Sequence, residues 1–461
     1  MNRRRFLAEL AAAGMMTSLP GFGQSANKVR LEIDSSKRGA TIPEDFTGLS
    51  YESAQLANPA FFSGANKQLI DLFRGLSPMG NLRIGGGSSE FTTYSDADPA
   101  GPPPFEVFGP DTSKTVKHGT VTTALALRNL RAFLDATGWS CLYGLNLGQG
   151  TKENAAAEAA AVHRILGPRL VAFQLGNEPD SFRNRYRPAS YWPADYLKEW
   201  NEFHDAVVAI TPEAKFAGPD ISNKLTYLTA FAEEAPKHKD VILLTGHYYA
   251  MGPAGSPGAT LDQLAEPDPK QATMHAAGFA AVAKAMMTAG LPFRMSEGNS
   301  CWNGGQPGVS NTLASALWCA DLVLHFAALG WSGVNLHGGG NGIYAPIVGA
   351  PSTGFTRRPE YFGIQFGQQF AGATVLASTL TGAEAKLTAY VVEEKARRRV
   401  AMINKTDAAI GVELPSRVGA SAMRLSGPGL ESTEGTVFGE VRIARSRDVL
   451  VEAHSAMIYE L

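Results

Sequence analysis

The sequence predicts a (β/α)8 barrel followed by an antiparallel β-sandwich, and three observations lead to this fold class. Short apolar runs alternate with helical patterns eight times between residues 45 and 371. From residue 372 to 461 the pattern changes to short β-like runs separated by Gly, Pro, Ser and Asn, which is typical of a β-sandwich. The length of 461 residues suffices for one domain of barrel size and a smaller one.

The first segment resembles an export signal. Residues 2–7 read Asn-Arg-Arg-Arg-Phe-Leu, and the apolar stretch that follows ends at Leu19, too soon to span a membrane comfortably. We therefore expect a twin-arginine signal over residues 1–23, export to the periplasm or the medium of a bacterium, and no membrane association once the signal is removed. Residues 28–44 then contain an alternating strand that has no place in the barrel, and we expect it to join the sandwich.

The barrel strands are predicted from apolar runs of suitable length, and helical spacing fills the intervals between them. The runs lie at residues 46–51, 81–84, 141–147, 170–175, 216–221, 241–244, 292–296 and 333–336. A doubly wound sheet would alternate in the same way, but it needs a glycine-rich turn that opens a helix after its first strand. The run Gly338–Gly342 continues into Ile343-Tyr344-Ala345-Pro346, which does not open a helix, and the barrel is therefore favoured.

Two carboxylic acids follow predicted strands on opposite sides of the barrel mouth. Glu178 follows the fourth strand within Asn177-Glu178-Pro179, and Glu297 ends the seventh. Because proline bars the preceding residue from the helical region, we expect Glu178 to be extended and to point out of the strand end. Active sites of parallel barrels lie at these ends. Two facing carboxylates predict cleavage of a glycosidic bond, in which one acid protonates the leaving oxygen and the other can attack the sugar.

Aromatic and amide side chains gather at the same predicted strand ends. Tyr248 would hold a nucleophilic carboxylate by a hydrogen bond, and Trp302 and Tyr344 would line a sugar pocket. Asn177 would bind a hydroxyl beside the reacting carbon, and Glu52 would accept hydrogen bonds from hydroxyls further round the ring. Each residue taken singly also fits a structural role, as part of the core rim, a turn or a solvated acid.

Composition excludes several other classes of function. The formal charge of −2 becomes −4 when residues 1–23, with three arginines and one glutamate, are removed, and nucleic-acid binding proteins normally carry a basic face. Three cysteines and no Cys-x-x-Cys or His-x-x-x-His spacing give a disulfide framework or a metal site little support. We expect a monomer that uses no cofactor and no metal.

The chain resembles the heparanase and β-glucuronidase family, glycoside hydrolase family seventy-nine of the retaining barrel clan. The motifs that carry this resemblance are 46–52 (Phe-Thr-Gly-Leu-Ser-Tyr-Glu), 74–78 (Arg-Gly-Leu-Ser-Pro), 82–86 (Leu-Arg-Ile-Gly-Gly) and 247–249 (His-Tyr-Tyr), beside the Asn-Glu-Pro motif. The resemblance covers the whole barrel, and that family has the same plan of barrel and sandwich. It implies that Glu178 is the acid/base, Glu297 the nucleophile and Tyr248 the partner of the nucleophile.

The resemblance also implies substrate-binding residues. Asn177, Glu52 and, in the long second loop, Asp111 would contact sugar hydroxyls. The uronate carboxylate would be held by loops after strands seven and eight, at Gly304, Gly342 and Tyr344. The chain departs from the family where relatives have a tyrosine five residues after the nucleophile, because Trp302 stands there. An indole donates one hydrogen bond and accepts none, which weakens the expectation of uronate recognition.

Together these observations predict an exported, retaining exo-β-glucuronidase that acts on terminal glucuronic acid of glycans or of aryl glucuronides. Three related activities remain open with the same machinery: an endo-acting heparanase-like enzyme, a β-xylosidase and an α-arabinofuranosidase. A barrel that binds carbohydrate without cleaving it is the alternative of another class, and the presence of both acids argues against it.

Overall fold

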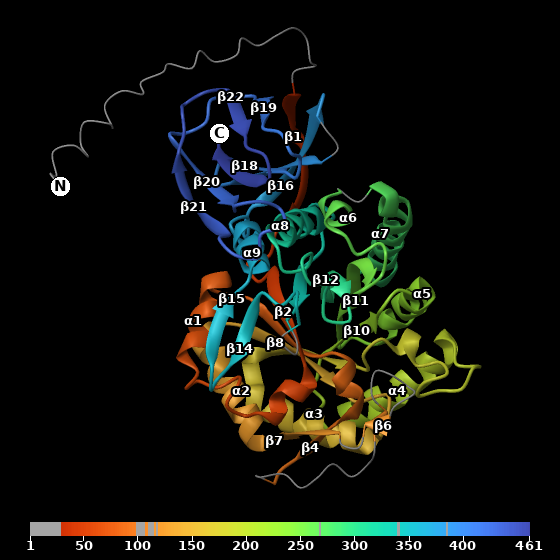
Figure 1. The fold of residues 1–461 in the computed structure, drawn as a ribbon. Helices are drawn as coiled ribbons and strands as arrows, with labels where there is room; N and C mark the ends of the chain where they lie inside the picture. The colour runs from red at the N-terminus through yellow and green to blue at the C-terminus, as the bar shows by residue number, and fades with distance from the viewer. Residues whose placement is uncertain are drawn as a thin grey trace, which may run out of the picture.

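The computed structural model describes residues 29–97, 107–108, 115–116, 119–266, 269–338, 342–383 and 386–461 (Figure 1). The predicted export signal, residues 1–23, and the predicted sugar ligand Asp111 lie outside these residues. Among the described residues, no helix combines the length and the apolar composition that a membrane span requires.

Eight parallel strands form a closed barrel, as the alternation of apolar runs predicts. Around the barrel the order is β10-β11-β12-β13-β2-β3-β8-β9, so the first and last strands in the sequence are neighbours. The strands are β2 (Thr47–Glu52), β3 (Asn81–Gly85), β8 (Ser140–Leu145), β9 (Leu170–Leu175), β10 (Phe216–Ile221), β11 (Val241–Pro253), β12 (Phe293–Trp302) and β13 (Gly333–His337). Two of them, β11 and β12, continue several residues beyond their predicted ends and extend past the mouth of the barrel.

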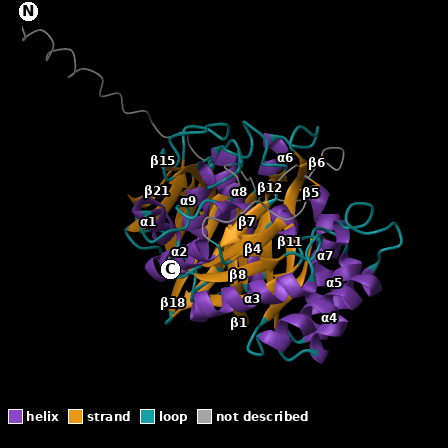
Figure 2. Cartoon of the chain, turned by 90° about the horizontal axis from the view of Figure 1, so that it is seen from below, coloured by secondary structure: helices purple, strands orange, loops and turns teal. Residues whose placement is uncertain are grey.

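Helices surround the barrel strands, as the view in Figure 2 shows. They are α1 (Lys67–Leu76), α2 (Ala124–Thr137), α3 (Lys152–Leu166), α4 (Pro193–Ile210), α5 (Leu225–Glu234), α6 (Leu261–Ala265), α7 (Pro269–Ala289), α8 (Leu313–Ala328) and α9 (Pro359–Gln368). Three two-stranded sheets lie in the loops. They are the parallel pair β4 (Thr92–Ser95) and β7 (Thr120–Thr123), and the antiparallel pairs β5 (Val107–Phe108) with β6 (Thr115–Val116) and β14 (Ile347–Ala350) with β15 (Gly354–Arg357).

The predicted sandwich is one hydrogen-bonded sheet of nine strands, which lies beside α8 and α9 in Figure 1. Its order is β21-β20-β23-β18-β17-β16-β1-β19-β22, and its pairs are antiparallel except for β1 with β19. The strands are β1 (Val29–Thr41), β16 (Thr374–Thr381), β17 (Leu387–Glu394), β18 (Arg397–Asn404), β19 (Ile410–Glu413), β20 (Ser421–Ser426), β21 (Val437–Arg442), β22 (Asp448–Val451) and β23 (Ser455–Glu460). The N-terminal strand β1 therefore joins the C-terminal sheet, as expected.

The nine-stranded sheet is fastened to the barrel through α8. Nearly every residue of this helix is buried, because it packs on the barrel on one side and on the sheet on the other. The carboxylate of Asp321 in α8 accepts hydrogen bonds from Thr388 and Tyr390 of β17 and lies 2.7 Å from Nζ of Lys405. Burial alone would raise the pKa of Asp321, but Lys405 and these donors hold it below its ordinary value. A satisfied buried ion pair thus links the two parts of the chain.

Two layers of polar side chains lie inside the barrel, beside a small apolar cluster of Leu142, Ala172, Ala217 and Leu243, where most barrels fill this space with branched apolar side chains. In a lower layer, Nε of Arg294 donates to Asn335, which donates in turn to Asn81. In the layer above, Nε of Arg83 donates to Oε1 of Gln174 at 3.0 Å, and Gln174 donates to Asp220. These buried groups are hydrogen-bonded to one another, so the layers cost little desolvation and give the mouth of the barrel a rigid polar floor.

Candidate active site

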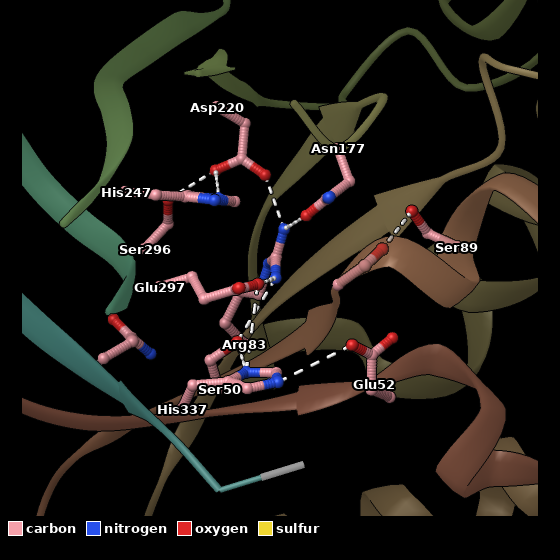
Figure 3. Close-up of polar contacts among 12 residues, drawn as sticks. Ser50, Glu52, Arg83, Ser89, Asn177, Asp220, His247, Ser296, Glu297 and His337 are labelled. Atoms are coloured by element: carbon pink, nitrogen blue, oxygen red, sulfur yellow. Dashed lines mark hydrogen bonds and ion pairs between the residues drawn. The ribbon is translucent and has the colours of Figure 1, made fainter. Parts of the chain in front are cut away.

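Glu297 lies within β12 and is held from two sides. Its side chain is 9% exposed. Oε2 accepts a hydrogen bond from Nη1 of Arg83 at 2.7 Å, and Oε1 accepts one from the hydroxyl of Tyr249 at 2.8 Å. With one donor on each oxygen, the carboxylate has a fixed orientation, which Figure 3 shows for the side of Arg83.

Glu178 follows β9 by three residues, and its backbone differs from the prediction. The residue adopts a left-handed conformation, with φ 51° and ψ 54°, where the proline rule led us to expect an extended one. Proline disfavours the right-handed helical region for the residue before it, and the left-handed region satisfies the same restriction. The amide of Glu178 donates to the carbonyl of Asp220 at 2.9 Å, which fastens the turn to β10.

The two carboxylates face each other across the barrel mouth with His247 beside them. Nδ1 of His247 lies 2.9 Å from Oε1 of Glu178, and one ligand atom from each of Glu178, His247 and Glu297 lies within 4.8 Å of the others. The side chain of Glu178 is 29% exposed, so one acid is open to solvent and the other is enclosed. The predicted opposition of the ends of strands four and seven is thus found in the structure.

Arg83 is the centre of the polar network below the two acids (Figure 3). Its side chain is 1% exposed. Nη2 donates to Oδ1 of Asn177 at 2.7 Å and to Oδ2 of Asp220, and Nη1 donates to Glu297 and to the hydroxyl of Ser50. The planar guanidinium has five N–H donors in a fixed fork, so a single side chain sets the relative positions of four strand ends.

Two histidines add positive charge around Glu297. Burial alone would lower the pKa of His247, but the charges of Asp220 and Glu297 raise it well above its ordinary value. The pKa of His337 is raised as well, since the charge of Glu297 and contact with Glu52 outweigh burial. Burial in turn opposes ionisation of Glu297, but His337, His247 and Arg83 lower its pKa to about 2. Glu297 is therefore a carboxylate at any pH near neutrality.

Tyr249, and not Tyr248, is the partner of Glu297. Successive side chains of a strand point to opposite faces, so His247 and Tyr249 project into the site while Tyr248 projects toward the helices. The ring of Tyr248 packs against Phe326 with centroids 5.1 Å apart. Burial and the charge of Glu297 raise the pKa of Tyr249 well above its ordinary value, and the hydroxyl stays protonated as a donor. The assignment of Tyr248 was wrong by one residue.

A cavity of about 480 Å³ opens over the two acids. The residues that line it are Glu52, Glu178, Ser181, Ser222, Asn223, Tyr249, Met251, Glu297, Trp302, Asn303, Gly304, His337 and Tyr344. Four of the predicted binding residues are among them, namely Glu52, Trp302, Gly304 and Tyr344. Asn177 and Gly342 are not among the residues that line the cavity: Asn177 accepts a hydrogen bond from Arg83, and Gly342 lies against the backbone of Gly304.

Glu52 closes the cavity at the end of β2. Its Oε2 accepts hydrogen bonds from the amide and the hydroxyl of Ser88, and Oε1 lies 3.6 Å from Nε2 of His337. Burial alone would raise the pKa of Glu52, but His337 and Ser88 hold it below its ordinary value. Glu52 is therefore ionised and can accept hydrogen bonds, and its contact with sugar hydroxyls stays a prediction.

The sequence gives signals for several site residues to which we assigned no role. Arg83 and Asp220 are charged residues within predicted barrel strands, and His247 and His337 lie three residues and one residue beyond the predicted ends of such strands. Alternation along a barrel strand sends every second side chain inward, so a charged residue there belongs to the floor of the mouth. That rule was available from the sequence for Arg83 and Asp220, and the two histidines are marked only by their place after a strand.

Glu90 had no comparable signal, since it comes from a loop after β3. Its carboxylate is 1% exposed and accepts hydrogen bonds from the amides of Asn177 and Gly148. Burial raises the pKa of Glu90 to about 7 against the effect of these donors. The contact fixes the backbone just before Glu178, and only the folded chain brings these segments together.

Comparison with known proteins supplies two kinds of relative. The chain is 26% identical to a β-glucuronidase of Neurospora crassa over 78% of its own length and 68% of the relative's. It is 26% identical to a β-glucuronidase of Aspergillus niger over 82% of its own length and 76% of the relative's. No family model matches the chain.

Solved structures share the fold at lower identity. A 4-O-α-L-rhamnosyl-β-D-glucuronidase from Fusarium oxysporum, determined as a complex with Rha-GlcA, superposes with a TM-score of 0.69 at 16% identity and covers 94% of this chain and 100% of that one. A family 51 arabinofuranosidase from Xanthomonas axonopodis superposes with a TM-score of 0.67 at 15% identity, over 94% of this chain and 99% of that one. At identities of this size, the superpositions show that the barrel with its accessory sheet is a fold that these structures share with the chain.

Proposed function

We propose that this chain, a glycoside hydrolase homologous to the fungal β-glucuronidases, is a retaining exo-β-glucuronidase that releases terminal β-linked glucuronic acid. The homology agrees with the resemblance of its motifs to the heparanase and β-glucuronidase family. The observation that carries the proposal is the pair of acids, Glu178 and Glu297, at the mouth of the barrel with unequal surroundings.

In the proposed first step, Glu297 attacks the anomeric carbon while Glu178 gives its proton to the leaving oxygen. The glycosidic bond breaks and an ester bond between the sugar and Glu297 forms. A water molecule then attacks the same carbon, Glu178 takes its proton, and Glu297 departs as a carboxylate. Retaining enzymes hold the two carboxyl groups about 5–5.5 Å apart, and inverting enzymes about 6.5–9.5 Å apart. The separation within 4.8 Å between oxygens of Glu178 and Glu297 supports the retaining form.

The charges around the pair support the assignment of roles. A nucleophile must be ionised before substrate binds, and the three cationic neighbours of Glu297 keep it so. An acid/base must exchange its proton in each half of the cycle, and the exposed side chain of Glu178 can do this through solvent. His247 contacts Glu178 at 2.9 Å and lies 3.3 Å from Asp220 on its other side, so its ring is held in place for that exchange.

A place for the uronate carboxylate is supported by the turn that follows β12. Asn303, Gly304 and Gly305 have φ values of 61°, 83° and 89°, and Asn303 and Gly304 line the cavity, so the backbone of this turn lies at its edge. The amides of Ile343 and Tyr344 donate to the carbonyl of Gly304, which brings the ring of Tyr344 to the same end of the cavity. We also propose that the enzyme is exported and that it acts on the ends of glycan chains.

Assays with a panel of 4-nitrophenyl glycosides test the proposal directly. We expect hydrolysis of the β-glucuronide and activity roughly 10⁴-fold lower, the order of discrimination that a site built to hydrogen-bond a substrate group gives, on the β-xyloside, the β-glucoside and the α-arabinofuranoside. The anomeric form of the first sugar released, followed by proton NMR, should be β. A first product in the α form would exclude retention, and a preference for the arabinofuranoside would replace the proposed substrate.

A further inference from the structure

Two histidines and an aspartate meet at the end of the barrel opposite the catalytic cavity. His204 lies on α4, His238 follows the single helical turn Ala235–Lys237, and Asp240 directly precedes β11. One ligand atom from each of the three lies within 4.8 Å of the others. The strands of a parallel barrel begin at this end and active sites lie at the other, so the proposed reaction gives the cluster no role.

His204 is held between two carboxylates. Its side chain is 8% exposed. Nδ1 lies 3.0 Å from Oδ1 of Asp205, and Nε2 lies 3.1 Å from Oδ2 of Asp240. Because a neutral imidazole carries one proton, it can donate to only one of these carboxylates. The contact with Asp240 therefore requires a positive charge between Nε2 and the carboxylate, which either a second proton or a metal ion supplies.

The surroundings of His238 favour the metal ion. Its Nε2 is buried and has no hydrogen-bond partner among the described residues. Oε1 of Glu234, at 3.5 Å, is beyond the usual range of a hydrogen bond, and this carboxylate is paired with Nζ of Lys237 at 2.7 Å. A proton on His204 would leave this nitrogen unpartnered at a cost in free energy, whereas a metal ion would use it as a ligand.

Aromatic rings enclose the two imidazoles. The ring centroids of His204 and His238 are 4.6 Å apart, and Trp200 stacks on His204 with centroids 5.0 Å apart. Trp200 also lies 5.2 Å from the centroid of His238, and Phe216 lies 4.7 Å from that of His204. An apolar wall strengthens the attraction between a cation and a carboxylate. A histidine that binds a metal commonly donates its other N–H to a carboxylate, and Asp205 stands in that position.

We propose that His204, His238 and Asp240 bind a zinc ion that fastens α4 to the segment before β11. Two imidazoles and a carboxylate are ligands that zinc takes at about 2.0–2.2 Å, so ligands of a tetrahedral ion lie about 3.4 Å apart. The 3.1 Å between His204 and Asp240 fits this spacing, and ligand atoms that are 4.8 Å apart would have to approach by about 1.4 Å.

The proposed ion is structural. It joins residues that are 36 positions apart in the chain, at the end of the barrel that serves stability and not chemistry. The His-x-x-x-His rule cannot detect such a site, because its ligands come from a helix and from the loop before a distant strand. The site is additional to the proposed glucuronidase activity and does not depend on it.

Zinc content after dialysis tests the site. The full chain is stripped with EDTA, loaded with zinc chloride and dialysed, and zinc is measured by atomic absorption. We expect His238→Ala and Asp240→Asn to retain about one ion per chain less than the wild type, the loss of one site. His454→Ala is the matched control, because His454 contacts Asp407 at 2.9 Å but belongs to no group of three ligands among the described residues, and it should retain the wild-type content.

Thermal melting supplies a second measurement. With zinc at a hundredfold excess over its Kd, Tm should rise by roughly 3 °C in the wild type and in His454→Ala, and by less than about 1 °C in His238→Ala. Glu178, His247 and Glu297 are the other described group that could hold a metal. All three variants keep that group, so zinc bound there is the same throughout and cancels in the comparison.

The outcomes are distinct from those of the glycoside assays. Equal zinc contents and equal shifts of Tm in the wild type and in His238→Ala would overturn the site and leave a proton between His204 and Asp240. A loss of zinc in His454→Ala as large as in His238→Ala would show binding to any accessible histidine and would overturn it as well. Circular dichroism checks the fold of each variant, and Asp240→Asn, which keeps the size of the side chain, decides if His238→Ala does not fold.

Discussion

The two acids of the cavity stand in opposite surroundings although they face the same space. Glu297 is enclosed, with hydrogen bonds from Arg83 and Tyr249 and with His337 3.8 Å away. Glu178 is three times as exposed, at 29% against 9%, and within the described residues its carboxylate has a single side-chain contact, with His247. One carboxylate is fixed in position and charge, and the other is partly open to water.

This difference shows how a barrel can give identical side chains different chemistry. Both are glutamates after parallel strands, so neither residue type nor topology distinguishes them. What differs is the number of positive neighbours, and these come from the polar floor, through Arg83 and the two histidines. Opposite charges within a few ångströms favour the ionised form of an acid, and exposure favours exchange. In the proposed mechanism, the roles of Glu178 and Glu297 therefore follow from the residues that surround each carboxylate.

Removal of each acid in turn should have the largest effect on kcat, and it tests directly whether the two acids have different roles. For Glu297→Ala we expect a loss of roughly 10⁵-fold in kcat on every glucuronide, because the first bond cannot form. For Glu178→Ala we expect a loss of about 10²–10⁴-fold on a glycan, the usual worth of a general acid. On 4-nitrophenyl β-glucuronide the first step needs little protonation, so a burst of nitrophenolate should persist.

Sodium azide provides the control for this pair of variants. In Glu178→Ala, azide should attack the sugar ester of Glu297 and yield a β-glucuronosyl azide, which NMR identifies by its anomeric coupling. In Glu297→Ala, azide can only replace the missing nucleophile and would yield the α-azide. The reverse pattern of products would exchange the two roles, and equal losses on both substrates in Glu178→Ala would contradict its role as acid.

Substitution of Arg83 should make the surroundings of Glu297 more like those of Glu178, because one of its positive neighbours is removed. In Arg83→Gln the pKa of Glu297 should rise, since an adjacent guanidinium lowers the pKa of a carboxyl by about 1–3 units. A nucleophile is lost as the pH falls through its pKa, so the acid limb of kcat/KM should move to higher pH. We also expect a loss of roughly 10²-fold at neutral pH from misplacement of the strand ends.

Arg83→Lys is the variant that separates charge from geometry. Lysine keeps the positive charge but cannot bridge Glu297, Asn177 and Asp220 with a planar fork. Its rate at neutral pH should therefore fall, while its acid limb stays near that of the wild type. An acid limb that is the same in Arg83→Gln and in the wild type would show that the two histidines alone keep Glu297 ionised.

The fold was accessible from the sequence because its signals are local. Apolar runs that alternate with helical spacing predict the barrel, and the strand at residues 29–33 lacks a place in it and so belongs to the other sheet. The sequence predicts the sandwich, but not that its two sides belong to one curled, hydrogen-bonded sheet, because strand pairing depends on contacts between distant segments. The left-handed backbone of Glu178 was missed for a similar reason, since proline excludes one region but does not choose between the others.

The site was predicted less completely than the fold. The two acids end or follow strands and could be found by position, but their unequal surroundings depend on how Arg83, His247 and His337 approach them, and only the folded barrel sets these contacts. Export by residues 1–23 and the contact of Asp111 with sugar stay predictions, because both lie outside the described residues. The assignment of Tyr248 as the partner of Glu297 was an avoidable error. Because side chains alternate along a strand, an inward His247 implies an inward Tyr249 and an outward Tyr248.

Neighbouring tyrosines supply the finest test of the comparison, with the smallest expected effect. Tyr249→Phe removes the hydrogen bond to Oε1 of Glu297 and leaves the ring. A hydrogen bond to a charged group contributes about 1.5 kcal/mol or more, so kcat on 4-nitrophenyl β-glucuronide should fall roughly tenfold. Tyr248→Phe removes the same group from a ring that packs on Phe326, and it should change kcat less than about twofold, any effect being on thermal stability. If Tyr248→Phe lowered kcat more than Tyr249→Phe, the second donor on Glu297 would be the wrong one, and the orientation of the enclosed acid would have to rest on Arg83 alone.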